Sequence, residues 1–347
     1  MIIDVHTHAF PHQGSACGNE GNQQSLITHA WGRMISSTFD EKYKPLPGED
    51  VNLKVGKYGR FYWTKHGKEC WIQRYSTMMV EMEWAPEQMI AFMDAEGVDR
   101  AVLQAGYMEA NYCRKYFADC VKRWPNRFIG TVRIDYNIEK SEEYRQGELK
   151  KLRDSVHNNM HGVLQGFPEE QKVDDERFEP FWAEMANLKI PHFFSTGFVP
   201  KERYLESIEQ IARVLKKFPD LNGIIGHLGG NVKQPSDPDY TDTPSELLNL
   251  LKLPNVYFEV GYVLAYENRA VWKQNYEYPY PLHTKLIKRI YDEVGAERLL
   301  FGSDMPNTYR TCTYKQCLDL VRLHFNFLNE EEKSLVLGGN AVKLFRV

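Results

Sequence analysis

The hydrophobic pattern of the chain changes at about residue 85. Beyond this point, short apolar runs alternate with amphipathic segments of helical length. Strands that alternate with helices in this way predict βαβ units and a parallel sheet. Together with the apolar opening segment, the pattern predicts strands at residues 1–9, 100–104, 128–134, 162–165, 190–196, 222–227, 256–260 and 298–301.

Each predicted strand except the first leads promptly into a predicted helix. The helix at 86–97 shows the usual end signals, with Pro86 in its first turn and Gly97 at its end. Eight such strands on one unbroken chain predict an α/β fold of the (β/α)8 TIM-barrel type, with a single domain over residues 1–347. A doubly wound open sheet is the alternative. The other helices are predicted at 110–124, 142–157, 175–188, 201–218, 243–251, 282–294, 313–327 and 330–345, the last with a break at Gly338-Gly339.

Residues 10–84 are an exception, because they show no sustained periodicity and are rich in aromatic and polar residues. A loop this long in a compact domain is usually functional or disordered. The aromatic density favours an ordered lid, or cap, over a substrate pocket, with a hairpin at 54–63. In this hairpin Arg60 is a candidate for binding a substrate carboxylate, since a guanidinium matches a planar acid with two donors. A solvated turn residue is the alternative.

The opening segment, Met1-Ile-Ile-Asp-Val-His-Thr-His-Ala9, places polar side chains at a spacing of two. Side chains alternate between the faces of an extended strand, so Asp4, His6 and His8 are expected to project together. Two neutral imidazoles on one strand can bind a divalent cation. The alternative reading is a surface pair or a tag remnant.

A distant carboxylate supports the metal-binding interpretation. Asp304 follows a second apolar run, in Leu299-Leu-Phe-Gly-Ser-Asp-Met-Pro306. A metal site drawn from the first and last strands requires those strands to be neighbours, and a closed barrel makes them so.

Polar residues also stand at the carboxyl ends of the other predicted strands, where such barrels carry their chemistry. His227 lies in Ile224-Ile-Gly-His-Leu-Gly-Gly230, whose glycines allow a tight turn and leave the imidazole accessible. We interpret His227 as functional rather than as a hydrogen-bonded core residue, because it falls at the expected end of its strand. Gln165 occupies a similar position, as do four candidates for substrate binding, Asn111, Arg133, Ser195 and Glu259.

Composition narrows the class of protein. The 347 residues are 42% hydrophobic and carry a formal net charge of −4, which offers no basic field for nucleic acid or for anionic membranes. No stretch approaches the roughly 18 apolar residues of a membrane helix, and the N-terminus lacks an export signal. Six cysteines form no CxxC pair, so we expect free thiols and a cytoplasmic location.

Several motifs together resemble the amidohydrolase superfamily, and more narrowly its branch around aminocarboxymuconate semialdehyde decarboxylase. They are the opening Asp-Val-His-Thr-His, Asp94-Ala-Glu-Gly-Val-Asp-Arg-Ala-Val102, His-Leu-Gly-Gly, Phe-Gly-Ser-Asp-Met-Pro and the final Gly-Gly-Asn340-Ala-Val-Lys-Leu-Phe345. The resemblance covers the first strand and about residue 85 to the C-terminus, whereas the lid region matches poorly.

The resemblance implies a divalent metal, zinc first with manganese or iron as alternatives. The implied ligands are His6, His8, a histidine ending the fifth strand and Asp304. His227 is the implied acid/base, and Asp304 would also act in catalysis by accepting a proton. Ser195 stands where the fifth-strand histidine is expected, and His192, three residues earlier, points to the opposite face of a regular strand. Three outcomes stay open: a weaker site using water or His227 as a further ligand, a second-metal arrangement recruiting Glu259, or no metal.

The activity implied by the resemblance is decarboxylation of an aromatic or unsaturated carboxylic acid. Hydrolysis of a lactone or amide, hydration, and oxygen-dependent hydroxylation at iron or manganese are the alternative reactions. A catalytically silent subunit paired with an active related barrel is the alternative from another class, motivated by Ser195. The implied partners are a small-molecule substrate and further subunits in a homodimer or homotetramer, or in a hetero-oligomer with a related barrel; nucleic acid and membrane are not expected.

Overall fold

A barrel of eight parallel strands forms the centre of the protein. The structure, a computed structural model, describes residues 1–13, 47, 54–104, 108, 110–164, 171–194, 201–229, 243–261 and 278–347. The strands follow one another around the barrel in chain order. They are β1 (Ile3–Thr7), β5 (Arg100–Leu103), β6 (Phe128–Val132), β7 (Met160–Leu164), β8 (His192–Phe194), β9 (Gly223–Ile225), β10 (Val256–Val260) and β11 (Leu299–Phe301).

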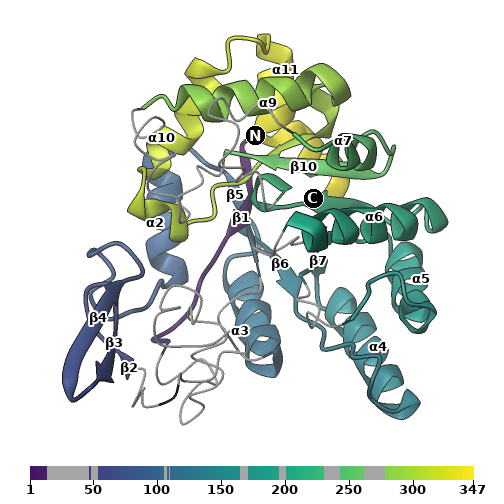
Figure 1. The fold of residues 1–347 in the computed structure, drawn as a ribbon. Coiled ribbons are helices and arrows are strands. Elements are labelled where there is room, and N and C mark those ends of the chain that lie inside the picture. The colour runs from purple at the N-terminus through teal and green to yellow at the C-terminus, as the bar shows by residue number, and fades with distance from the viewer. Residues whose placement is uncertain are drawn as a thin grey trace.

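The first and last strands of this sheet are neighbours. A parallel bridge joins Thr7, at the end of β1, to Met305, just beyond β11. Figure 1 shows β1 in the middle of the molecule with the helices arranged around it. The predicted (β/α)8 TIM barrel is therefore confirmed.

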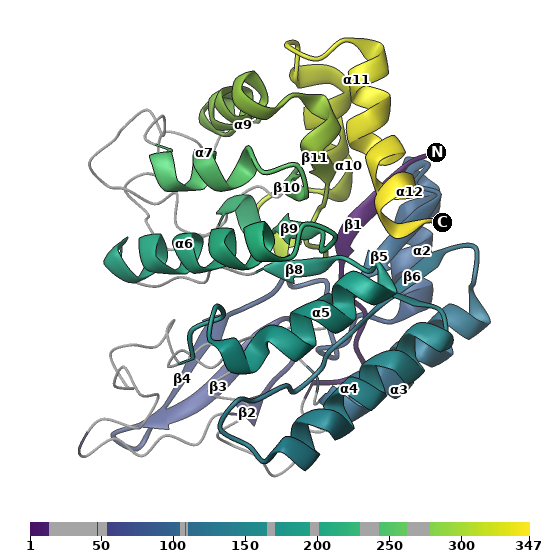
Figure 2. The same cartoon turned by 90° about the vertical axis from the view of Figure 1, so that its right-hand side faces the viewer.

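Helices cover the outside of the barrel, as Figure 2 shows for α3 to α6. The α-helices are α2 (Pro86–Glu96), α3 (Ala110–Arg123), α4 (Glu142–His157), α5 (Glu179–Leu188), α6 (Lys201–Lys217), α7 (Ser245–Leu251), α9 (Pro281–Val294), α10 (Tyr314–Asp319), α11 (Glu330–Ser334) and α12 (Asn340–Phe345). The short helical segments are η2 (Glu176–Phe178), η3 (His227–Gly229), η4 (Ala296–Arg298), η5 (Asn307–Arg310), η6 (Leu320–His324) and η7 (Leu335–Gly339).

The last predicted helix contains a π-helical turn, η7, instead of a break at its glycines. Position 338 requires glycine, because a Cβ there would lie 2.2 Å from the main-chain oxygen of Met1. The closing helical segment can therefore lie directly against the start of β1. In Figures 1 and 2 the two chain ends lie close together.

Two hydrophobic layers hold the barrel together. The larger lies mainly between the strands and the helices, and includes Val132, Phe178 and Trp182. The smaller fills the barrel interior and is closed by α12. Its buried members are Ile3, Val5, Val102, Ile129, Phe193, Ile224, Leu300, Ala341, Leu344 and Phe345.

The chain between β1 and α2 includes a separate antiparallel sheet. Its strands are β2 (Lys54–Val55), β3 (Arg60–Lys65) and β4 (Lys68–Gln73), paired in that order. The predicted hairpin at 54–63 is thus confirmed and has a third strand. Phe61 and Trp63 of β3 are buried in the larger hydrophobic layer, so this sheet contributes to the core, while its role as a lid stays a prediction.

Two expectations from composition can be compared with the described residues. Cys70, Cys113, Cys120, Cys312 and Cys317 are free thiols, as expected. No helix in the described parts of the chain combines the length and the apolar character needed to cross a bilayer.

Candidate metal centre

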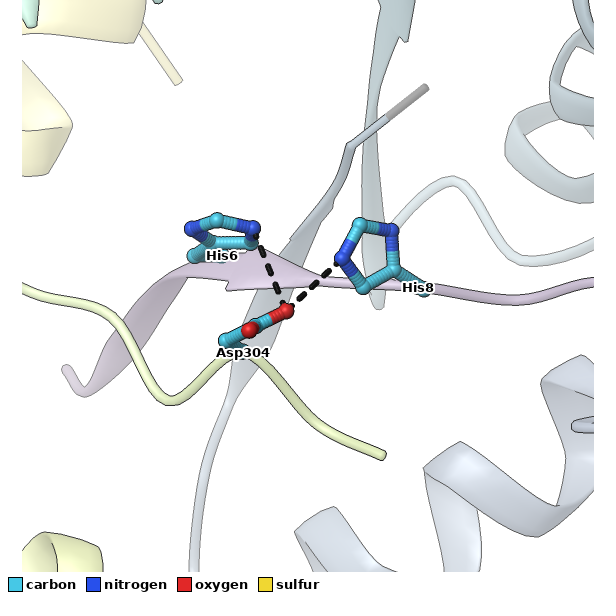
Figure 3. Close-up of side chains that lie close together, drawn as sticks. All are labelled: His6, His8 and Asp304. Carbon is cyan, nitrogen blue, oxygen red and sulfur yellow. Dashed lines mark hydrogen bonds and ion pairs between the residues drawn. The ribbon is translucent and has the colours of Figure 1, made fainter. Parts of the chain in front are cut away.

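Two histidines and one aspartate converge at the carboxyl end of β1. His8 Nε2 lies 2.9 Å and His6 Nε2 lies 3.4 Å from Asp304 Oδ1. Figure 3 marks both contacts with dashed lines. All three side chains are buried, and their possible ligand atoms lie within 4.8 Å of one another. The convergence expected from the sequence is therefore present in the fold.

Main-chain hydrogen bonds between the two ends of the barrel fix this arrangement. The Asp304 N–H donates to the His6 carbonyl at 2.7 Å, and the His8 N–H donates to the Met305 carbonyl at 2.8 Å. Asp304 has a positive φ of 54°, a conformation that Asp tolerates better than most residues. The segment after β11 thus brings the carboxylate to β1.

Asp4 does not join the two histidines. The register of β1 against β5 shifts between Asp4 and Thr7, so the strict alternation on which that expectation rested does not hold. The Asp4 carboxylate accepts hydrogen bonds from the Ser303 N–H at 2.9 Å and from the Ser303 hydroxyl at 2.6 Å. Burial raises the pKa of Asp4 to about 6, against the opposing effect of these hydrogen bonds. Asp4 therefore anchors the segment that carries Asp304.

Each of the two imidazoles is held in place by a hydrogen-bond partner at its Nδ1 atom, on the side of the ring away from Asp304. His8 Nδ1 lies 3.0 Å from the Gln104 carbonyl, and His6 Nδ1 lies 2.9 Å from each carboxylate oxygen of Glu259. A carbonyl oxygen only accepts, so the proton of His8 is on Nδ1. His6 Nδ1 likewise faces both oxygens of the Glu259 side chain, which accept its proton in a hydrogen bond. When the rings are neutral, as imidazole ligands of a metal must be, both Nε2 atoms direct lone pairs toward Asp304.

This donor set fits a divalent cation. Lone pairs of two imidazoles facing a carboxylate repel it unless a proton or a cation lies between them. Asp304 Oδ2 is also buried and makes no hydrogen bond within the described part of the chain, whereas buried carboxylate oxygens normally have a partner. Two donors that share one ion at about 2.0–2.1 Å in a tetrahedral set lie about 3.3–3.4 Å apart. The separations of Asp304 Oδ1 from the two Nε2 atoms, 2.9 and 3.4 Å, are near this value, and all the donor atoms lie within 4.8 Å of one another.

Electrostatics support the same conclusion. Burial lowers the pKa of His6, but the carboxylates of Glu259 and Asp304 outweigh this effect and raise it to about 9. Burial acts to raise the pKa of Asp304, yet His6 and His8 hold it below its usual range. Both shifts have one physical cause, since the carboxylates of Glu259 and Asp304 lie close enough to the imidazoles to favour positive charge on them.

His227 lies beside these residues. It begins η3, with Gly226 between it and the end of β9, and its ring centroid is 4.9 Å from that of His6. Its main-chain N–H donates to Glu259 Oε2 at 3.2 Å. Burial and the neighbouring charge of His6 lower the pKa of His227. The imidazole predicted to transfer protons thus stands next to the candidate metal ligands.

The other predicted substrate-binding residues have different positions. Arg60 in β3 lies with its guanidinium 4.1 Å from the ring of Trp71 and donates to Gln73 at 3.1 Å. Asn111, in the first turn of α3, accepts a hydrogen bond from Arg114, which also donates to the Arg133 carbonyl. Their substrate-binding roles stay predictions. Ser195 and Gln165 lie outside the described residues.

Glu259 contacts the ring of His6 and the main-chain N–H of His227. It therefore lies beside the candidate metal ligands, as a hydrogen-bond partner of one of them.

Two residues that contact the candidate ligands, Gln104 and Asn307, were not predicted from the sequence. Gln104 directly follows β5, and it contacts His8 through its main-chain carbonyl, so its side-chain type gave no signal for this contact. Asn307 donates from Nδ2 to Asp304 Oδ1 at 2.8 Å, and nothing in its local pattern distinguishes it from a turn residue.

The chain belongs to the amidohydrolase family, whose family model matches residues 3–347. No curated protein matches the sequence. Similar solved structures include enzymes of two reaction types, and at identities this low they establish the fold alone.

One similar structure is a probable 2-pyrone-4,6-dicarboxylic acid hydrolase from Acinetobacter baumannii, with a TM-score of 0.61, 16% identity and coverage of 100% of this chain and 99% of that one. A 2,6-dihydroxybenzoate decarboxylase from Rhizobium has a TM-score of 0.53 at 16% identity, over 75% of this chain and 88% of that one. A 5-carboxyvanillate decarboxylase from Sphingomonas paucimobilis has a TM-score of 0.51 at 16% identity, over 74% and 82%.

Proposed function

We propose that this protein is a metal-dependent decarboxylase that acts on a planar aromatic or unsaturated carboxylic acid. The observation that carries the proposal is the convergence of His6, His8 and Asp304, with both imidazoles fixed by partners on their Nδ1 side. Zinc is the first choice of metal, because two histidines and a carboxylate with room for substrate form a common catalytic zinc set. Manganese and iron are the alternatives.

Each residue of the site has a separate task in this proposal. His6, His8 and Asp304 would hold the cation, which polarises a substrate carboxylate or lowers the pKa of a bound water. Glu259 and the Gln104 carbonyl keep the two imidazoles in the tautomer that presents Nε2. The burial of the three ligands excludes bulk water, which strengthens their electrostatic interaction with substrate.

His227 is the proposed proton carrier. Loss of carbon dioxide leaves the electron pair of the broken carbon–carbon bond on the ring or alkene carbon, which must then take up one proton. Because the pKa of His227 is lowered, its neutral form prevails at neutral pH and its protonated form is a stronger acid than free histidine. Both properties suit a group that collects a proton and delivers it to carbon.

The similar structures support the substrate class. Two of them are a 2,6-dihydroxybenzoate decarboxylase and a 5-carboxyvanillate decarboxylase, and a third is a probable 2-pyrone-4,6-dicarboxylic acid hydrolase. All three of these named substrates are planar rings that carry carboxylates. A planar carboxylic acid is therefore the substrate class that we propose for this chain.

Hydrolysis of a lactone or amide is the second candidate function. The probable 2-pyrone-4,6-dicarboxylic acid hydrolase aligns over 100% of this chain, whereas the two decarboxylases cover 75% and 74% of it. In this reaction, neutral His227 would accept the proton of the attacking water. The two reactions thus share the ligands and differ in the direction in which His227 first moves a proton.

Two assays on the purified chain test the proposal. Its metal content is measured, and carbon dioxide release is followed with a panel of hydroxybenzoates, in parallel with hydrolysis of a panel of ring lactones. We expect carbon dioxide release that a chelator abolishes and that added zinc or manganese restores. Chelator-sensitive lactone hydrolysis without carbon dioxide release would support the second candidate.

Metal content separates both reactions from a silent subunit. Retention of about one equivalent of transition metal agrees with a single catalytic site. A chain that binds no metal and is inactive on both panels would contradict the proposal and support a silent partner subunit.

A further inference from the structure

An arginine of the inserted segment is buried close to the candidate metal centre. Arg74 directly follows β4 and is fully buried, with its guanidinium 4.6 Å from the ring of Tyr75. Burying a guanidinium is costly unless its donors are engaged. One of them, Nη2, donates to Asn307 Oδ1 at 3.1 Å.

This hydrogen bond determines which way the Asn307 amide faces. A guanidinium only donates, so the Asn307 oxygen must face Arg74 and the amide nitrogen must face the other way. That nitrogen donates to Asp304 Oδ1 at 2.8 Å. A reversed amide would place an oxygen against the carboxylate and an NH₂ group against the guanidinium, and both contacts are repulsive.

The two hydrogen bonds therefore form a directed chain from the inserted sheet to a candidate metal ligand. Its outer end is anchored, because the N–H groups of Arg74 and Tyr75 both donate to the Gly59 carbonyl, at 2.8 and 2.9 Å. Gly59 has a φ of 75°, and a Cβ there would lie 2.5 Å from the Tyr75 carbonyl oxygen. Glycine thus permits the close approach that anchors Arg74.

We propose that Arg74 and Asn307 are positioning residues that orient the Asp304 carboxylate for cation binding. The inference rests on the proposed metal site and extends it, because it makes the inserted sheet a part of the site's framework. Asn307 contacts one carboxylate oxygen of Asp304 and restricts rotation of the group. Arg74 acts through Asn307 by fixing its amide.

Zinc affinity is the measurement that tests this role. The whole chain and its variants are titrated with zinc against a chromophoric chelator, after circular dichroism has confirmed that each variant is folded. We expect Arg74→Met and Asn307→Ala each to weaken zinc binding about 10- to 100-fold, the usual effect of removing a partner of a metal ligand. Arg74→Lys retains the charge and one donor, and should recover part of this loss.

The double variant makes the test specific. If Arg74 acts only through Asn307, removing both residues should do no more than removing one. The Arg74→Met/Asn307→Ala variant should then have about the same zinc affinity as whichever single variant has the lower affinity. Losses that multiply would contradict the proposed chain, as would zinc affinities within about twofold of wild type for both single variants.

Arg298→Met is the matched control. Arg298 is a partly buried arginine that ends η4, directly before β11, and donates to the Leu253 carbonyl at 3.1 Å. Its loss should lower stability without changing zinc affinity, and an equal loss of affinity in this variant would contradict a specific role for Arg74. Failure of the proposed function itself has a different signature, since wild type would then not bind zinc at all.

Discussion

His8 Nε2 lies 2.9 Å from Asp304 Oδ1, although 296 positions separate the two residues in the chain. The contact exists because the barrel closes, with β1 against the segment that follows β11. Neither residue is part of a metal site without the other. Closure of the barrel and assembly of the candidate site are therefore one structural event.

Removal of a direct ligand should affect metal binding most strongly. We expect His8→Ala to lower zinc affinity by more than about 100-fold, beyond the range typical of a residue that only supports a ligand. Competition titration with a chelator measures the effect. His157→Ala, which changes an exposed histidine in the last turn of α4, should bind zinc like wild type, and equal behaviour of the two variants would contradict the ligand assignment.

Glu259 should influence the site through the ring of His6. Glu259→Gln retains the shape of the side chain but loses the charge and one of the two oxygens that face His6 Nδ1. We expect zinc affinity about 10- to 100-fold below that of wild type, measured by the same titration. In Glu184→Gln, which removes a carboxylate paired with Arg153 on the helical layer, affinity should stay unchanged.

His227 should be needed for turnover and not for metal binding. With whichever substrate the panels identify, His227→Asn should lower kcat by about 10²- to 10⁴-fold, the usual contribution of general acid–base catalysis. Zinc content should stay near that of wild type. Full activity in this variant would refute the proton-transfer role, and loss of zinc would identify His227 as a further ligand.

Acid should destabilise the protein partly through His283. This residue of α9 is buried against Phe325, and burial lowers its pKa to about 4. The unfolded chain, with a histidine pKa near 6.5, takes up the proton first, so the stability contribution is complete above about pH 6.5 and is lost as the pH falls toward 4. By pH 5 the loss amounts to about 2 kcal/mol.

Urea denaturation at pH 7 and pH 5 tests this expectation. In His283→Phe the ring and its packing remain but the titrating group is absent, so the fall in unfolding free energy between the two pH values should be smaller by about 2 kcal/mol. His157→Gln is the control and should retain the full pH dependence. An unchanged pH dependence in His283→Phe would mean that another group is responsible.

The inserted sheet should contribute to stability as well as to any lid function. Phe61 of β3 is fully buried in the larger hydrophobic layer, so Phe61→Ala should cost about 3–5 kcal/mol in unfolding free energy. Tyr62→Ala changes the next residue, which is only partly buried, and should cost less. If both variants retained the stability of wild type, the sheet would be a removable cap.

The sequence predicted most of the barrel correctly because its signals are local. Each strand is a short apolar run, and each helix has a periodic face or an end signal, such as Pro86 and Gly97 for α2. Predicted boundaries agree with the structure to within a few residues, and α4 spans the predicted 142–157. The differences lie inside two helices: predicted helix 313–327 contains the π-helical turn η6, and the closing helix contains η7 instead of the predicted break. The approach of Gly338 to Met1 in the closing helix is a long-range contact that no local pattern encodes.

For the candidate site, sequence alone determined which residue types stand at the ends of the strands, among them His6, His8, His227 and Asp304. Only the tertiary structure decided which atoms meet. It directed Asp4 to Ser303, because a register shift in β1 breaks the alternation of side chains. It also brought Glu259 to His6 and connected Arg74 through Asn307 to Asp304. The physical reason is that strand periodicity fixes the direction of a side chain over a few residues, whereas hydrogen-bond partners separated by tens to hundreds of residues are chosen by the closure and packing of the whole barrel.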